Sequence, residues 1–307
     1  MGMRIIALLA SYNEERFIGN CLSHLARHGV DAYLIDDGST DQTVPIAQGF
    51  LGKGLISIET FPREVPRDVG FPLHAILRRK AELATTLDAD WFIHMDPDEV
   101  RLPPRSNMTL AEAFEEVDIQ GYNAVNFLEY VFVPTRETPD HDHPDYEHTM
   151  HWYYPYIRHF PHRLNAWKRQ PDRVDLASSS GHIVDFPGLR MFPESFPMRH
   201  YLFLSVAQAG RKYGPHRVKT ERSDSRERWR SQLKPERILL PSQTELREYH
   251  GDDQLDHSNP RTNHFLAKAV PKASEGSDEL PASDLLAAAR SLPRIRGRFR
   301  ADTLRKR

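Results

Sequence analysis

Two carboxylates stand two positions apart at Asp96 and Asp98, directly after the apolar run Trp91–Met95. Such a pair can hold a hard divalent cation and leave coordination positions open for phosphate oxygens. A diphosphate leaving group needs a cation of this kind, because negative charge builds on its bridging oxygen as the bond breaks. Residues 96–99 are also compatible with a solvated turn, since Asp and Pro are common in turns.

Two more polar clusters follow apolar runs. In Ser11–Glu15, the ring of Tyr12 could stack on a nucleobase. In Asp36–Asp41, the Asp37 carboxylate could accept a hydrogen bond from a base N–H, such as the imide of uracil or thymine. Taken singly, each cluster is also explained as a turn between a strand and a helix with a polar cap.

The elements that must position these clusters alternate between strands and helices. Continuous apolar runs predict buried strands at residues 5–9, 32–35, 55–58 and 91–95. Helical spacing of apolar residues predicts helices at residues 18–28, around 44–47 and at 72–87. This alternation favours an α/β fold around a mostly parallel sheet. Ligands bind beyond the carboxyl ends of such strands, which is where all three clusters lie.

The second half of the chain is predicted with fewer regular elements. A helix near 109–117, a strand at 124–133, strand-like fragments at 156–160 and 166–168, and a helix at 201–213 are expected. Residues 135–162 are rich in Pro and His and are expected to form a long loop. The chain is divided into a nucleotide-binding domain, 1–220, and a polar, partly disordered C-terminal extension, 221–307, with helical and irregular pieces and a basic tail, 290–307.

Composition narrows the class of protein. The 307 residues carry 41 Lys and Arg against 43 Asp and Glu, a formal net charge of -2. Dedicated nucleic-acid binders carry a basic excess, so no nucleic-acid partner is expected. Cys21 is the single cysteine, which excludes an intramolecular disulfide. The run Met1–Ala10 is short for a signal sequence, and no apolar stretch approaches the roughly 20 residues of a membrane span, so a cytoplasmic protein is expected.

Three segments taken together, Ala10–Glu15, Ile35–Asp41 and Met95–Glu99, resemble the signatures of the family-2 glycosyltransferases. The resemblance spans residues 3–215 and is strongest over the first hundred. It implies the GT-A fold, a nucleotide-sugar-binding α/β domain. It also implies transfer of a sugar, with inversion, from a UDP-, dTDP- or GDP-linked donor to a hydroxyl group. The acceptor would be a carbohydrate or a lipid-linked molecule in polysaccharide or glycolipid assembly.

The resemblance further implies roles for individual residues. The nucleobase would lie against Tyr12, and Asp37 would bond its imide edge. Asp98 would bind Mn²⁺ or Mg²⁺, with Asp96 reaching the ribose or making a second contact to the metal. The nucleotide-binding residues expected on this basis are Tyr12, Asn13, Asp36, Asp37, Arg79 and Asp96.

The chain departs from the family pattern at two places. Many members carry an Arg-Asn pair before the metal motif, where this chain has Arg79 and Lys80. The Glu-Asp pair that often supplies the catalytic carboxylate is absent from the sequence. A non-catalytic nucleotide-sugar-binding or scaffold protein of the same fold therefore remains an alternative. A nucleotidyltransferase is a second alternative, although Ser11–Glu15 lacks the Gly and Lys of its phosphate loop.

Two later segments, residues 179–186 and 198–201, resemble Gly-His and Arg-His-Tyr segments of a bacterial branch of the family. Their histidines, His182 and His200, are candidates for metal or diphosphate contacts, and each could instead be a structural histidine. An inverting transfer also needs a base that deprotonates the acceptor hydroxyl. Asp185 is the preferred candidate for that base, with Glu194 as the second and Asp175 behind them.

Two surface features are candidates for acceptor contacts. Residues 141–162 contain six histidines, whose spacing matches no zinc pattern, and four aromatic residues that could stack on sugar rings: Trp152, Tyr153, Tyr154 and Tyr156. The tail, 290–307, holds eight basic residues and one acid. It could dock on anionic lipid headgroups at the inner membrane face, or it could be a solvated end.

Overall fold

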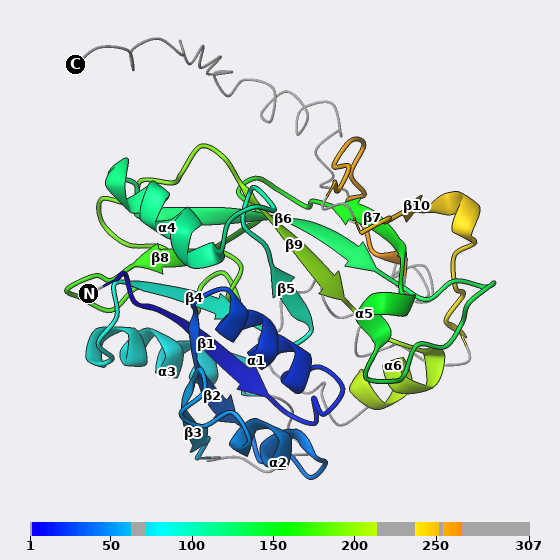
Figure 1. Cartoon of the computed structure of the whole chain (residues 1–307), viewed down its shortest axis with the longest axis horizontal. Coiled ribbons are helices and arrows are strands. Elements are labelled where there is room, and N and C mark those ends of the chain that lie inside the picture. The colour runs from blue at the N-terminus through cyan, green and yellow to red at the C-terminus, as the bar shows by residue number, and fades with distance from the viewer. Residues whose placement is uncertain (1, 63–71, 214–236, 252–253, 266–307) are drawn as a thin grey trace, which may run out of the picture. The chain divides into compact units, whose positions relative to one another are not determined.

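A mixed sheet of ten strands lies at the centre of the described part of the chain, residues 2–62, 72–213, 237–251 and 254–265 of the computed structural model. Its first part is parallel, as the sequence predicts. The strands run in the order β3 (Leu55–Thr60), β2 (Asp31–Asp36), β1 (Ile5–Ser11) and β4 (Trp91–Met95). Parallel register brings the carboxyl ends of these strands to one edge of the sheet (Figure 1).

Antiparallel strands extend the sheet beyond β4. The strand β8 (Arg163–Lys168) pairs with β4 and with β6 (Ala124–Phe132), and β7 (Trp152–Tyr156) continues along the same edge of β6. On the other edge of β6 lies β9 (Phe196–Tyr201), which runs parallel to it and pairs with β5 (Glu99–Arg101). The short β10 (Arg247–Glu248) closes the β7 edge.

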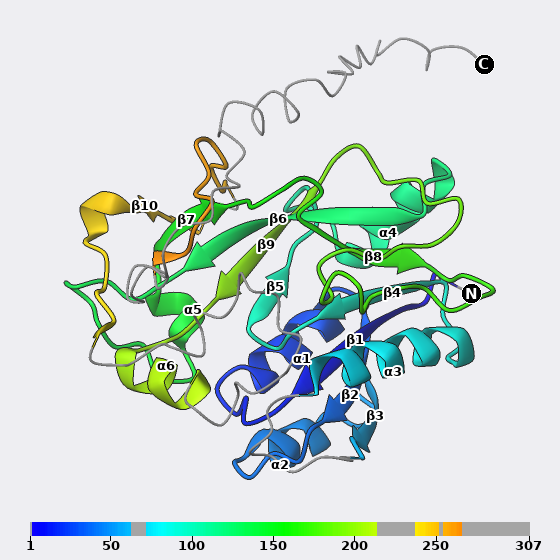
Figure 2. The same ribbon diagram turned by 180° about the vertical axis from the view of Figure 1, so that it is seen from behind.

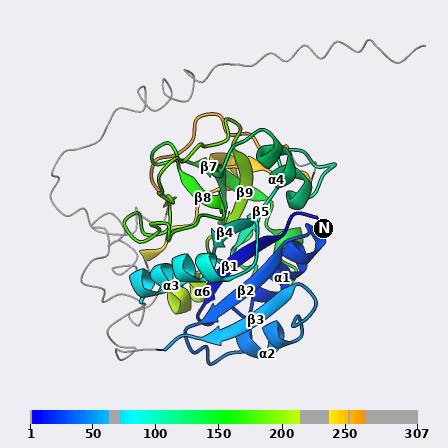
Figure 3. The same cartoon turned by 90° about the vertical axis from the view of Figure 1, so that its left-hand side faces the viewer.

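Helices cover both faces of the parallel strands. Along β1, Ile5, Ala7 and Leu9 face α1, while Ile6 and Leu8 face α3, which explains the unbroken apolar run. Figures 1 and 2 show these two helices on opposite sides of the sheet, and Figure 3 shows the strands between them. The helices on the first face are α1 (Ile18–Arg27), α2 (Thr43–Gln48) and α4 (Leu110–Ile119), and the helix on the second face is α3 (Leu73–Thr86).

The region expected to be a loop, residues 135–162, contains α5 (Tyr146–Thr149) and the strand β7. The rings of Tyr153, Tyr154 and Tyr156 are at most 7% exposed, because both faces of β7 pack against other parts of the core. These three rings are therefore not available to stack on sugars, contrary to the sequence-based expectation. Trp152 alone among the four aromatic residues is half-buried.

The helix expected at 201–213 is shorter than predicted. Tyr201 ends β9, and α6 (Val206–Lys212) begins after Ser205, whose hydroxyl caps it by accepting a hydrogen bond from the Gln208 N–H. The six residues of β9 alternate between the two faces of the sheet, a period that the sequence analysis missed.

Residues beyond the expected boundary at 220 contribute to the same compact unit, Met1–Ala273. Tyr249 and Leu255 pack against one cluster of core residues, and Ile238 and Phe265 belong to another. A 3-10 turn, Gln243–Glu245, precedes β10. The first compact unit therefore extends beyond residue 220, where the sequence analysis placed the boundary between the two parts of the chain. The basic tail, 290–307, lies outside the described residues. Within the described ranges, none of the helices is both long enough and apolar enough to cross a membrane.

Candidate active site

The three polar clusters meet at the carboxyl edge of the parallel strands. Ser11 lies beside Asp36 in the β1–β2 ladder, and its hydroxyl donates to that carboxylate over 3.0 Å. The side-chain oxygen of Asn13 accepts from the backbone N–H of Thr40 over 2.8 Å, while the Asn13 N–H donates to Ser39 over 2.9 Å. Asn13 and Asp36 therefore tie the first two clusters to each other.

Two further residues that were expected to bind the nucleotide lie in these joined loops. Asp37 is buried at the end of β2, and Tyr12 is half-buried at the end of β1. Gly38, between Asp37 and Ser39, has a φ of 71°, a backbone conformation that favours glycine. The turn after β2 therefore depends on the glycine that the sequence places there.

The third cluster is centred on the buried carboxylate of Asp98. Its Oδ2 atom lies 2.5 Å from Nζ of Lys212 and 3.3 Å from Nε2 of His200. Burial by itself would raise the pKa of the Asp98 carboxyl, but these two cations outweigh it and hold the pKa well below its usual range. Asp98 is thus an ionised carboxylate at the end of β4, with positive charge on one side.

A chain of ion pairs continues from Asp98 into the sheet. His200 donates from Nδ1 to Oε1 of Glu129 over 2.6 Å, and His162 bonds the other oxygen over 2.7 Å. Arg163 reaches the same Oε2 atom over 3.0 Å. Burial would lower the pKa of His200, but Asp98 and Glu129 together raise it to about 9. We call Asp98, His200, Glu129, Lys212, His162 and Arg163 the Asp98 cluster.

Glu99 and Arg101 fix the turn that presents Asp98. Oε2 of Glu99 accepts from the backbone N–H of Asp96 over 3.2 Å and from the Arg101 guanidinium over 2.7 Å. Arg101 is fully buried, and its guanidinium lies 4.3 Å from the ring centre of Phe127. The carboxylate of Asp96 is exposed at this turn.

Arg79 and Lys80 have different surroundings. The guanidinium of Arg79 bonds Glu59 over 2.9 Å and Glu82 over 3.0 Å, at the outer side of α3. Lys80 is fully buried and lies 2.8 Å from Nδ1 of His94, and its burial lowers its pKa to about 8. Lys80, at which the chain departs from the family pattern, is therefore a core residue that contacts β4 through His94.

The remaining predicted residues lie apart from the Asp98 cluster. His182 lines a cavity of about 300 Å³ together with His74 and His159. Asp185 is exposed, and its backbone exchanges two hydrogen bonds of 2.9 Å with Asp175. Glu194 is exposed just before β9, at the opposite end of that strand from His200. In the described structure, no hydrogen bond or ion pair joins Asp185 or Glu194 to the cluster.

Four residues of the cluster were not predicted as site residues: Glu129, His162, Arg163 and Lys212. Glu129 is a charged residue inside the apolar strand 124–132, and that contrast is a signal that could have revealed it. Lys212 lies 114 positions after Asp98, in the last turn of α6, and no local pattern marks it. The partners of both residues are set only by the tertiary structure.

The metal-ligand set predicted from the sequence does not assemble as a whole. Within the described ranges, no three His, Cys, Asp or Glu side chains converge as they would around a metal ion. Both ring nitrogens of His200 face carboxylates, and His182 lies in a separate cavity. Asp98 and Asp96 are the oxygen donors that remain at the turn after β4.

The fold and site define a class: a GT-A-type nucleotide-binding domain, with a parallel sheet whose strand ends carry the polar clusters. The chain belongs to glycosyl transferase family 2, whose family model matches residues 7–169. This family match supports glycosyl transfer over the nucleotidyltransferase alternative. A search of curated protein sequences found no match.

Three solved structures are similar to parts of the chain. The S. aureus TarS 1-349 complex with UDP is 18% identical, with a TM-score of 0.31, over 44% of this chain and 36% of that one. A second structure of S. aureus TarS 1-349 is 12% identical, with a TM-score of 0.37, over 75% of this chain and 70% of that one. The glycosyltransferase GlyE of Streptococcus pneumoniae TIGR4 is 17% identical, with a TM-score of 0.27, over 43% of this chain and 30% of that one.

Proposed function

We propose that this glycosyltransferase transfers a sugar from a nucleoside-diphosphate donor whose diphosphate lies against the Asp98 cluster. One observation carries the proposal: a buried, ionised carboxylate at the end of β4 stands beside the ammonium group of Lys212. A departing diphosphate gathers negative charge, and fixed cations that meet this charge lower the barrier to transfer. Lys212 would be such a cation.

Asp98 and Asp96 fit a divalent cation such as Mn²⁺ or Mg²⁺. Among the described residues, Lys212 and His200 both reach Oδ2 of Asp98, and neither bonds Oδ1. Oxygen donors suit both metals, and the open sides would be completed by phosphate oxygens and water. When bound, the cation would neutralise charge on the leaving diphosphate. His200 fits a positioning role rather than a ligand, because it is bonded to two carboxylates.

The nucleoside would occupy the loops after β1 and β2. Tyr12 would stack on the base, and Asp37 would accept a hydrogen bond from its imide, which favours UDP, dTDP or GDP as the nucleotide. Asp36 and Asn13 would act indirectly, because their side chains join the two loops. Arg79 would have to break its ion pair with Glu59 before it could bind the nucleotide.

The acceptor side remains a prediction. We propose a carbohydrate or lipid-linked hydroxyl as acceptor, inversion at the sugar, and a role in polysaccharide or glycolipid assembly. Asp185 remains the first candidate for the base and Glu194 the second, and either would need the acceptor to approach from outside the cluster. Docking of the basic tail on the inner membrane face belongs to the same proposal.

A thermal-shift series tests the donor and metal proposals together. The full chain is melted with UDP, dTDP, GDP or CDP, each with and without Mn²⁺, and the same series is run on Asp98→Asn. A ligand that binds only the folded protein raises its melting temperature. We expect a metal-dependent shift with one nucleotide that Asp98→Asn abolishes. Asp88→Asn is the matched control, because that side chain is 93% exposed.

Release of UDP, dTDP or GDP from the corresponding sugar nucleotides measures turnover in the same variants. A shift that is equal in Asp98→Asn would contradict the assignment of this carboxylate. A shift of equal size with and without Mn²⁺ would contradict the metal proposal. Lys212 would then be the proposed cation at the diphosphate.

A further inference from the structure

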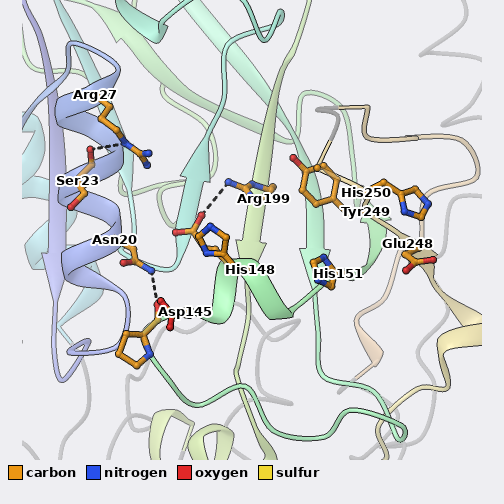
Figure 4. A pocket seen from close by; sticks show the side chains of 13 residues that line it. Asn20, Ser23, Arg27, Asp145, His148, His151, Arg199, Glu248, Tyr249 and His250 are labelled. Carbon is orange, nitrogen blue, oxygen red and sulfur yellow. Dashed lines mark hydrogen bonds and ion pairs between the residues drawn. The ribbon is translucent and has the colours of Figure 1, made fainter.

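A second cavity, of about 650 Å³, opens between α1, the α5 region, β9 and the segment after β10. Asn20, Ser23 and Arg27 line it from α1, Arg199 lines it from β9, and Tyr249 lines it from the far side. Figure 4 shows Arg199 in the middle, with the α1 side chains on one side and Tyr249 on the other. The cavity volume lies within the range of small-molecule sites.

This cavity lies across β9 from the Asp98 cluster. Successive side chains of a strand point to opposite faces of its sheet. His200 faces Glu129 and Asp98, so its neighbour Arg199 faces the other way. Val100 pairs with Arg199 in the ladder and packs with Tyr201 in the core of that second face. The cavity is thus separate from the proposed donor site.

The walls of the cavity are held in place by contacts within the protein. Arg199 is bonded to Glu147 over 3.1 Å and to the hydroxyl of Tyr201 over 3.1 Å. The backbone N–H of Tyr249 donates to the His151 carbonyl over 2.8 Å, and its ring meets Phe132 edge to face. The cavity is therefore formed by ordered side chains before any ligand enters.

The charges around the cavity select a chemical class of ligand. The guanidinium groups of Arg27 and Arg199 face a lining that also holds Asp145, Glu147 and Glu248. A phosphate or another anion would meet these carboxylates, and a cation would meet the guanidinium groups. A hydroxyl both donates and accepts hydrogen bonds, so a neutral polyhydroxylated ligand can use both kinds of group.

The aromatic ring of Tyr249 adds an apolar surface beside the polar groups. Its ring is half-buried, with one part packed on the core and the rest lining the cavity. The C–H groups of a sugar ring can pack on such a surface while its hydroxyls bond the charged groups around it. We propose that this cavity is a second carbohydrate site, which binds a neutral oligosaccharide away from the proposed donor site.

Binding of neutral trisaccharides to the full-length protein tests the proposal. Saturation-transfer NMR is run with maltotriose, cellotriose and the trimer of N-acetylglucosamine as probes. Ser23 is an exposed residue of α1 on the cavity wall, so Ser23→Trp fills the cavity without disturbing the core. We expect at least one probe to bind, with affinity reduced by about tenfold or more in Ser23→Trp. Ile119→Trp, at a position 79% exposed on α4, is the matched control.

The outcomes separate this site from the donor site. Retained nucleotide-dependent thermal shifts in Ser23→Trp would show that the variant is folded and that only the second site is blocked. Binding that survives in Asp98→Asn supports the proposal. The proposal is overturned if none of the three probes binds the wild type, or if Ser23→Trp binds as well as the wild type. Loss of binding in Asp98→Asn alone would place the saccharide at the donor site and would also overturn it.

Discussion

The side chains of two neighbouring residues of β9, His200 and Arg199, face two regions of the molecule that are built differently. The side of His200 is closed: Asp98, Glu129 and Lys212 there are at most 8% exposed, Lys212 bonds Asp98, and His200 bonds both carboxylates. The side of Arg199 is an open cavity whose outer wall, including His148, His151 and Glu248, is exposed. Both regions contain many charged side chains, but those around Arg199 are more exposed to water than those around His200.

Burial changes what a charged group does. Inside the Asp98 cluster each ion is bonded to partners, because a buried charge without a partner costs several kcal/mol. That arrangement shifts pKa values and couples each residue to the next. In the open cavity water screens the charges, so their hydrogen bonds can be exchanged for those of a ligand. The two regions should therefore respond differently to substitution.

Removal of Glu129 should have the largest effect on stability. Glu129→Ala leaves His200, His162 and Arg163 without their shared carboxylate, and breaking a buried ion pair costs about 3–5 kcal/mol. Urea unfolding measures the loss. Glu116→Ala is the control, because it breaks the exposed pair with Arg105, for which about 0–1 kcal/mol is expected. Equal losses in the two variants would contradict the distinction between buried and exposed charges.

Asp98→Asn should reduce turnover, and it should also cost stability, because it breaks the buried pairs with Lys212 and His200. It keeps the shape of the side chain but removes the charge that holds Lys212 and is proposed to bind the metal. We expect kcat to fall by about 10²–10³, because Lys212 and the proposed metal, which would meet the charge of the leaving diphosphate, lose the carboxylate that holds them. Release of nucleotide from the sugar nucleotide measures this fall, and circular dichroism checks the fold. Turnover near that of Asp88→Asn would argue that the chemistry lies elsewhere.

The pH dependence of the free energy of unfolding should show the titration of His200. Its pKa is about 9 in the folded protein and about 6.5 when unfolded, so the folded state binds its proton more tightly. The resulting stabilisation, up to about 3 kcal/mol, is complete below pH 6.5 and is lost as pH rises through about 9. His200→Gln should lack this decline. Taking the difference between wild type and variant cancels the titration of Lys80, which is present in both.

The smallest effect on stability is expected in the open cavity. His148→Ala and Glu248→Ala remove exposed side chains, and such changes alter unfolding free energy by about 0.5 kcal/mol or less. Saccharide binding by the same variants should nevertheless weaken, while nucleotide-induced thermal shifts stay unchanged. A large loss of stability in either variant would mean that this wall is part of the core and not a ligand surface.

The sequence was sufficient for the parallel half of the fold. Strands β1 and β4 are buried on both faces, and β2 is buried on one face and partly on the other. All three contain continuous apolar runs, with polar clusters directly after them. These clusters are local in sequence, and the rule that parallel strands share one carboxyl edge brings them together. The strand β9 was missed, because its alternation of inward and outward residues includes Pro197 and Arg199 and lacks an apolar run.

Residues close together in the chain are enough to predict the family, the parallel sheet and the turn that carries Asp96 and Asp98. The partners of Asp98 follow only from the folded chain. Lys212 lies 114 positions away, and Glu129 lies 71 positions before His200. Contacts over such separations follow from strand pairing and from the need to pair every buried charge, and neither leaves a local pattern in the sequence.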